Sequence, residues 1–145
     1  MKKEPLENRM GRKIRKVRQR RGYTMKEAAE HLGMTDRSLS SWERGVKRPG
    51  KSCLNRRLKT GELVGTFLFG SFEEYLGVFV SMEPETDQER AAYRALLFKT
   101  EKACESLGIT YGEEFAIQTV MNRLLMEELL EKWKGSQEKT AGGAG

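Results

Sequence analysis

One twelve-residue stretch, Met34–Gly45, combines an apolar pair with a set of side chains that can donate hydrogen bonds. The donors are Arg37, Ser38, Ser41 and Arg44. At about 100° per residue, Leu39 and Trp42 fall on one side of a helix, and most of the donors fall on the other. Arginine pairs with guanine O6 and N7 in the major groove of DNA, and short serines let a helix backbone approach the base edges. The stretch therefore predicts a helix that reads duplex DNA.

An ordinary solvated helix face is the alternative interpretation, but such a face usually carries long Glu and Lys side chains. The preceding segment, Met10–Arg21, favours the DNA interpretation because it predicts a basic amphipathic helix with Met10, Ile14 and Val17 on its apolar side. Its cations are Arg12, Lys13, Arg15, Lys16, Arg18, Arg20 and Arg21. A polyanion is the partner that such a helix favours.

Two short helices follow in the sequence, separated by a tight turn. Gly22 ends the basic helix. Thr24, with Glu27 three residues later, predicts a capping box at the start of the second helix. The second helix has Met25, Ala28, Ala29 and Leu32 on its inner side. Gly33 ends it, and Thr35 can cap the third helix, so a turn of about three residues joins the two helices, as in a helix-turn-helix.

The segment Ile14–Pro49 resembles the phage-repressor-like (Cro/C1, xenobiotic-response-element type) helix-turn-helix family, more weakly from about residue 10 to residue 60. The resemblance rests on the arginine late in helix one, the alanine-rich helix two and the Ser, Trp, Glu, Gly run that closes helix three. It implies a structural pair between Arg18 and Glu43. It also implies base contacts from Asp36, Arg37, Ser38 and Ser41. Met25 departs from the family, which often has a backbone-contacting Gln there.

Phosphate contacts are expected near helix ends and loops, where cations can reach the DNA backbone. The candidates are Lys26, Arg44, Lys47, Arg48 and Lys51. Charge is unevenly divided along the chain: residues 1–60 hold 19 Lys and Arg against 6 Asp and Glu, whereas residues 61–145 hold 8 against 15. This asymmetry indicates a polyanion-binding half beside a half with another role.

The second half predicts further helices. Leu54 and Leu58 fit a fourth helix, and Ser71 with Glu74 predicts a capping box at the start of a helix that runs to Met82. An apolar stripe then runs from about Pro84 to Leu107, and Thr110 with Glu113 predicts a last capping box. The helix after it has an apolar set too wide for one neighbour: Phe115, Ile117, Val120, Met121, Leu124, Leu125, Leu129, Leu130 and Trp133. Glu127 and Glu128 interrupt its heptad order, which argues against a parallel coiled coil.

Other classes of protein find little support in the sequence. Cys53 and Cys104 lack zinc or redox spacing, and the lone His31 has no nucleophile, phosphate loop or metal-ligand pattern beside it. Adjacent Glu pairs do not face each other on a helix as a catalytic pair would. We therefore expect no enzyme, cofactor or metal site. The charged N-terminus lacks a signal peptide and no apolar run reaches about 20 residues, so we expect a cytoplasmic protein without a membrane partner.

The sequence thus predicts an all-α fold, a lambda-repressor-like helix-turn-helix domain followed by a helical hairpin extension. The expected parts are a basic arm (1–8), the DNA-binding domain with closing helices (9–80), the hairpin (84–134) and a disordered tail (135–145). The predicted function is a sequence-specific DNA-binding transcriptional regulator of the repressor type, acting as a homodimer on double-stranded DNA with helix 35–45 in the major groove. The alternative is an antitoxin or anti-repressor-type module that binds a protein through residues 84–134.

Overall fold

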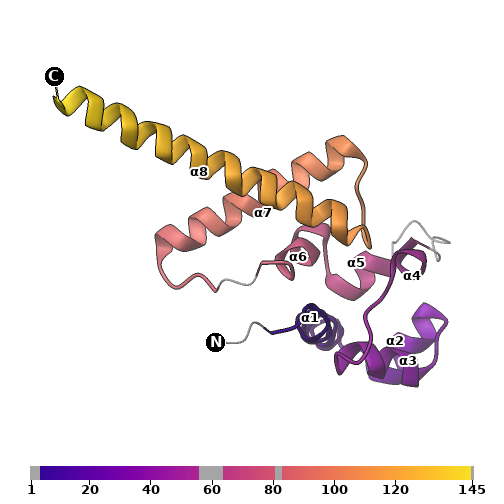
Figure 1. The fold of residues 1–145 in the computed structure, drawn as a ribbon. Coiled ribbons are helices and arrows are strands. Elements are labelled where there is room, and N and C mark those ends of the chain that lie inside the picture. The colour runs from indigo at the N-terminus through magenta and orange to yellow at the C-terminus, as the bar shows by residue number, and fades with distance from the viewer. Residues whose placement is uncertain (1–3, 56–63, 81–82, 145) are drawn as a thin grey trace. The chain divides into compact units, whose positions relative to one another are not determined.

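The computed structural model describes residues 4–55, 64–80 and 83–144. These ranges contain helices and no strand, which confirms the predicted all-α fold. Figure 1 shows the helices in chain order: α1 (Leu6–Arg20), α2 (Met25–Leu32), α3 (Asp36–Glu43), α4 (Lys51–Asn55), α5 (Val64–Phe69), α6 (Phe72–Gly77), α7 (Asp87–Leu107) and α8 (Glu114–Ala144). In the described ranges, each helix is too short or too polar to cross a lipid bilayer.

The chain divides into two compact units. The N-terminal unit is Met1–Glu83 with Thr110–Glu114, and the C-terminal unit is Pro84–Ile109 with Phe115–Gly145. The short segment between α7 and α8 therefore belongs to the N-terminal unit, although the sequence suggested one continuous hairpin from residue 84 to residue 134.

Helix α1 begins earlier than its apolar spacing predicted. Pro5 stands at the N-cap, and Glu7 lies in the first turn, where a negative charge interacts favourably with the helix dipole. Residues 6–8 of the predicted basic arm are therefore helical. Met10, Ile14 and Val17 are buried as predicted, and α1 packs against α3 and α5.

The region after Pro49 contains a helix that the sequence did not reveal. Leu54 on α4 is buried, whereas Leu58 lies outside the described residues. Helix α5 carries a nearly continuous apolar run, and its Phe69 is completely buried. A run that is buried on all sides lacks the amphipathic periodicity that predicts a helix, so the sequence pattern did not indicate α5.

Helix α6 starts where predicted but ends early. The Ser71 side chain caps it by accepting from the Glu74 N–H, and the helix stops at Gly77 instead of reaching Met82. Tyr75 and Leu76 are fully buried, so these side chains form core and not an interface.

The segment Thr110–Glu114 completes the core of the N-terminal unit. Tyr111 is buried and meets the Phe72 ring edge-on at 5.1 Å between centroids. The Gly112 N–H donates to the Tyr75 hydroxyl at 2.9 Å, and burial raises the pKa of that hydroxyl. The sequence predicted that Thr110 caps the last helix. Helix α8 instead begins at Glu114, so Thr110 is not its N-cap. The Thr110 N–H instead donates to the Glu113 carboxylate at 2.6 Å.

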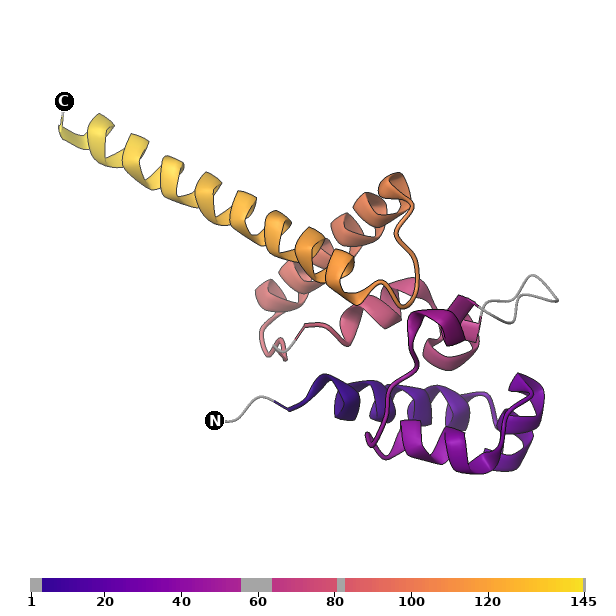
Figure 2. The same ribbon diagram turned by 45° about the vertical axis from the view of Figure 1, so that its right-hand side comes forward.

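In the C-terminal unit, α7 is capped by Thr86 and ends at Gly108, a glycine with a φ of 71°. Figures 1 and 2 show α8 crossing α7 and continuing past it. The buried side chains of these helices are Leu97, Thr100, Cys104, Ile117 and Met121.

Helix α8 continues to Ala144, so the tail predicted to be disordered from residue 135 is helical through residue 144.

Candidate nucleic-acid interface

The turn between α2 and α3 has the geometry that its sequence requires. Gly33 adopts a φ of 68° and a ψ of 35°, a left-handed conformation that glycine tolerates without a steric penalty. The N–H of Met34 then donates to Ala29 O at 2.9 Å, and the N–H of Gly33 donates to Glu30 O at 3.0 Å. These bonds close the last turn of α2, so only three residues separate the end of α2 from the start of α3.

Side chains fix the first turns of both helices. The capping box predicted from the sequence is complete: the Glu27 N–H donates to the Thr24 hydroxyl and the Thr24 N–H donates to the Glu27 carboxylate, both at 3.1 Å. Hydrogen bonding of the Glu27 carboxylate to the Thr24 side chain and to the Thr24 N–H holds its pKa below the ordinary value. Thr35 caps α3 by accepting from the Ser38 N–H at 3.2 Å.

Helix α3 is seated by its two apolar residues and by a close approach of α1. Leu39 is 1% exposed and Trp42 is 8% exposed. A Cβ on Gly11 would lie 2.6 Å from the backbone oxygens of both Trp42 and Glu43. Since backbone cannot yield as a flexible side chain can, only glycine permits this contact. The sequence carried only a weak signal for Gly11, a glycine inside a helical repeat.

An ion pair ties the end of α3 to α1. Arg18 Nε donates to Glu43 Oε2 at 2.7 Å and Nη2 donates to Oε1 at 3.1 Å, which makes the pair bidentate. Arg18 Nη1 also donates to Tyr23 O at 2.9 Å. Side-chain exposure is only 15% for Arg18 and 5% for Glu43. The hydrogen bond to Glu43 raises the pKa of Arg18 despite an opposing effect of burial. The pair is the one that the family resemblance implies.

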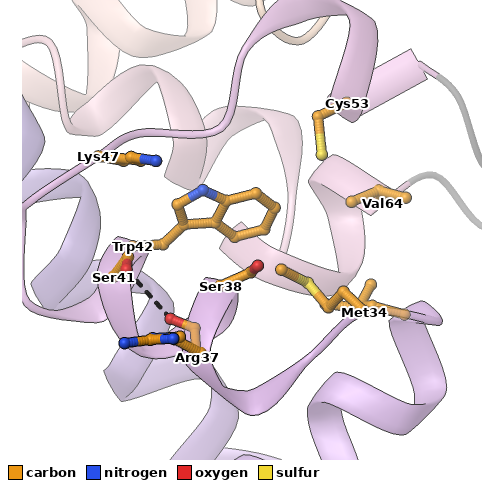
Figure 3. Close-up of a pocket in the computed structure, with 9 residues that line it drawn as sticks. Met34, Arg37, Ser38, Ser41, Trp42, Lys47, Cys53 and Val64 are labelled. Carbon is orange, nitrogen blue, oxygen red and sulfur yellow. Dashed lines mark hydrogen bonds between the residues drawn. The ribbon is translucent and has the colours of Figure 1, made fainter.

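The opposite side of α3 carries the predicted base-contacting residues. Asp36, Arg37 and Ser38 are exposed, and Ser41 is half-buried. Ser41 Oγ donates to Arg37 O at 3.0 Å, as the dashed line in Figure 3 shows, so this hydroxyl is partly engaged by its own helix. The Thr35 hydroxyl donates to Ser38 Oγ at 3.0 Å, which leaves the Ser38 proton available to a ligand.

A hollow of about 420 Å³ lies beside this face of α3. Figure 3 shows the side chains of Arg37, Ser38 and Ser41 with Lys47 around the Trp42 indole. Its lining residues are Leu32, Met34, Arg37, Ser38, Ser41, Trp42, Lys47, Cys53 and Val64. The hollow brings Lys47, predicted as a phosphate contact, to the same place as three predicted base contacts.

The other predicted phosphate contacts differ in their surroundings. Lys26 is exposed in the first turn of α2, and Arg44 is exposed with its Nε donating to Ser40 Oγ at 3.2 Å. Arg48 instead pairs with Glu7 and, at 3.0 Å, with Glu114.

Lys51 is also engaged, because it pairs with Glu113 at 3.1 Å. The hydrogen bond from the Thr110 N–H, with a smaller contribution from Lys51, lowers the pKa of Glu113. Arg48 and Lys51 therefore have carboxylate partners that DNA phosphates would have to replace.

Several cations of α1 are also paired, which the sequence did not indicate. Glu74 on α6 accepts from Lys13 at 2.8 Å and from Arg20 at 2.9 Å. The hydrogen bond from Arg20, with a smaller contribution from Lys13, lowers the pKa of Glu74 to about 2. Arg12 pairs with Glu4 at 2.6 Å. The positive field of α1 is therefore weaker than its composition suggests.

The His31 side chain lies beside two aromatic rings. It is exposed, and its ring stacks on Phe67 with a centroid separation of 4.5 Å and an interplanar angle of 14°. The Tyr23 ring lies 5.9 Å away.

The same segment of the chain is similar to known proteins. Residues 14–52 match the model of the family described as Helix-turn-helix. The matched residues contain α2, α3 and the turn between them. Over 78 residues the chain is 33% identical to the HTH-type transcriptional regulator ImmR of Bacillus subtilis (strain 168). The match covers 54% of this chain and 57% of that relative, so the chain spans little more than half of the relative's length. No solved structure matches the chain.

Proposed function

We propose that the chain is a sequence-specific DNA-binding transcriptional regulator of the repressor type. The observation that carries the proposal is the exposed polar face of α3, held outward by buried Leu39 and Trp42 within a Cro/C1-type helix-turn-helix. In this proposal α3 lies in the major groove, where its side chains reach the base edges.

Arg37 is the principal base reader in this proposal, because a guanidinium can donate two hydrogen bonds to guanine. Asp36, Ser38 and Ser41 flank it on the same helix face. Lys26, Arg44 and Lys47 contact phosphates directly, and Arg48 and Lys51 join them when their carboxylate partners are displaced.

The proposed regulator acts as a homodimer. One reading helix touches too few base pairs for selective binding in a genome, whereas two helices about one DNA turn apart double the readout. The ImmR match supports a regulatory role, since the printed name of that relative is that of a transcriptional regulator.

Selection of binding sites followed by titration tests the function. Arg37→Ala should lose about 1–3 kcal/mol of binding free energy on the selected site and lose specificity at one base pair. Arg94→Ala is the matched control, because Arg94 is an exposed cation on α7, in the C-terminal unit and outside the proposed interface. Equal affinity of the wild-type protein for all sequences at physiological salt would contradict the proposal.

A salt titration separates base readers from phosphate contacts. With six to ten phosphates engaged per dimer, affinity should fall by roughly 10³ to 10⁵ between 50 and 200 mM salt. Lys47→Ala should reduce the slope and weaken binding to every sequence alike, whereas Arg37→Ala should leave the slope nearly unchanged.

A second candidate is a protein-binding module of the antitoxin or anti-repressor type. The large apolar side chains exposed on α7 and α8, such as Phe98 and Phe115, favour this candidate. Sedimentation of the purified full chain discriminates between the two, because a protein-binding module would leave that surface uncovered and the chain monomeric.

A further inference from the structure

Helix α8 carries two apolar faces, and only one of them is covered. Ile117 and Met121 are 0% and 2% exposed, whereas Phe115, Met126, Leu129, Leu130 and Trp133 are each at least half exposed. At about 100° per residue, Phe115, Met126 and Trp133 fall within about 20° of one another. Ile117 and Met121 lie about 120° to 160° away round the helix. The exposed face is therefore separate from the buried one.

The exposed face has the spacing of a coiled-coil seam. Its central residues alternate four and three apart along the chain: Phe115, Thr119, Asn122, Met126, Leu129 and Trp133. This set is called the α8 seam below. Such a 3.5-residue repeat keeps one face of a helix turned toward a partner helix of the same kind.

Glu127 and Glu128 do not interrupt the α8 seam, although they appeared to break the heptad order in the sequence. They lie about 120° or more from its centre. Glu127 pairs with Arg123 at 3.3 Å and Glu128 pairs with Lys132 at 3.9 Å on the same helix. These ion pairs hold the charges on the flanks, so the seam itself is free of charge.

The exposed apolar area is large enough to form the centre of one side of a dimer interface. Phe115 is 88% exposed and Trp133 is 60% exposed, which together amount to about 220–370 Å² if a buried aromatic covers about 150–250 Å². Leu125, Met126, Leu129 and Leu130 are each about half exposed and add on the order of 30–60 Å² each. The total of roughly 350–600 Å² equals the largest apolar patch of a typical monomer, about 300–600 Å² and often functional, and is a large part of the roughly 800 Å² that each partner buries in a stable complex.

We propose that the α8 seam binds the α8 seam of a second copy of this chain, as a parallel helix pair. In a parallel pair, Leu125 of one copy faces Leu130 of the other across the edge of the seam, so both half-exposed leucines become covered. Thr119 and Asn122 are polar seam residues, which fix register at some cost in stability. The two Thr110–Glu114 segments, and the N-terminal units that contain them, are then attached at the same end of the pair.

This inference rests on the proposed function in one respect, the need for two reading helices on one DNA. The area, the spacing and the charge distribution support the helix pair independently of DNA binding. A different protein as the occupant would leave the purified chain monomeric, so the test below distinguishes it.

Sedimentation equilibrium of the full chain measures the pairing. The wild-type chain should be a dimer at micromolar concentration, and Leu129→Lys should weaken the dimer by about 100-fold or more, because a lysine would be buried without a partner. Phe98→Lys is the matched control: Phe98 is 59% exposed on α7 and should leave the dimer constant within about threefold. A monomeric wild-type chain, or a Leu129→Lys dimer of wild-type affinity, would overturn the proposal. A circular dichroism spectrum checks that each variant is folded.

Oxidative cross-linking measures the orientation. Met126→Cys should form a disulfide between two copies, because a parallel pair places the two positions opposite each other within disulfide reach. Glu131→Cys, on the polar side of α8, should cross-link no more than the wild-type chain with its native thiols. Failure of Met126→Cys to cross-link in a dimeric sample would overturn the parallel arrangement.

DNA titration separates this proposal from the proposed function. Monomeric Leu129→Lys should still bind a single half-site at low salt and lose the preference for paired half-sites. A wild-type dimer that pairs through α8 yet binds no selected DNA would sink the proposed function and leave the helix pair standing.

Discussion

The two units of this chain use their apolar residues in opposite ways. In the N-terminal unit, short helices of 5 to 15 residues bury nearly all of their large apolar side chains, and Val46 is the only large one exposed among the described residues of that unit. In the C-terminal unit, two long helices bury five side chains and expose eight large hydrophobic ones. Helix length therefore does not measure how complete a core is: the longest helix, α8, buries only Ile117 and Met121 among its described side chains.

The ion pairs also differ between the two units. In the N-terminal unit, cations are paired with carboxylates far away in sequence, such as Arg18 with Glu43 and Lys13 with Glu74. In the C-terminal unit, ion pairs join residues three or four apart on one helix, as between Arg123 and Glu127. Long-range pairs fix a tertiary arrangement, whereas pairs within a helix support only the helix itself.

The prediction with the largest expected effect concerns the difference in burial between the two units. It compares the same substitution, Leu→Ala, at a buried and at an exposed position. Leu39→Ala should lower the free energy of unfolding by about 2–5 kcal/mol, because it leaves a cavity at a fully buried position. Leu129→Ala, at a residue 61% exposed, should change it by less than about 0.5 kcal/mol when the chain is dilute enough to be monomeric.

Urea denaturation at several protein concentrations measures both variants. Equal losses for the two leucines in the dilute sample would show that the C-terminal unit has a core that the exposure of its side chains does not reveal.

The buried ion pair should give the next largest effect. Glu43→Gln removes one charge of a pair whose side chains are 15% and 5% exposed, so Arg18 would keep an uncompensated charge at a mostly buried site. The expected loss of stability is about 2–4 kcal/mol.

Glu127→Gln is the matched control in the C-terminal unit, because it breaks an exposed pair and should cost about 0.3–0.5 kcal/mol. Thermal unfolding monitored by calorimetry compares the two. Losses of similar size would contradict the distinction between long-range and local pairs.

The pH dependence of stability should give the smallest effect. The pKa of Glu74 is about 2 in the folded chain, below its ordinary value of 4.5, so its stabilisation is complete above about pH 4.5 and is lost as the pH falls toward 2. Because the side chain is 31% exposed and solvent screens the pair, we expect about 1 kcal/mol.

Glu74→Gln should therefore be less stable than the wild-type chain at pH 7, and the difference should shrink as the pH falls from about 4.5 to 2. Urea midpoints at a series of pH values measure it. A difference that is constant over this range would show that the Glu74 charge does not contribute.

The sequence alone determined the local features of the helix-turn-helix. Gly33 with its left-handed backbone, the Thr24–Glu27 capping box and the outward face of α3 all follow from short-range spacing, because caps, turns and helix faces depend on residues within about one helical turn. The resemblance to the family added Arg18 with Glu43, a pair that spacing within one helix cannot reveal.

Only the tertiary structure decided which long-range partners meet. Gly11 against the end of α3, Glu74 between Lys13 and Arg20, and Glu114 with Arg48 each join distant parts of the chain. The same is true of α8, whose apolar residues looked like one over-wide stripe with a broken heptad. The sequence shows that these residues are apolar. Whether each one is buried depends on what packs against its side of the helix. The tertiary structure therefore distinguishes the covered face of α8 from the α8 seam.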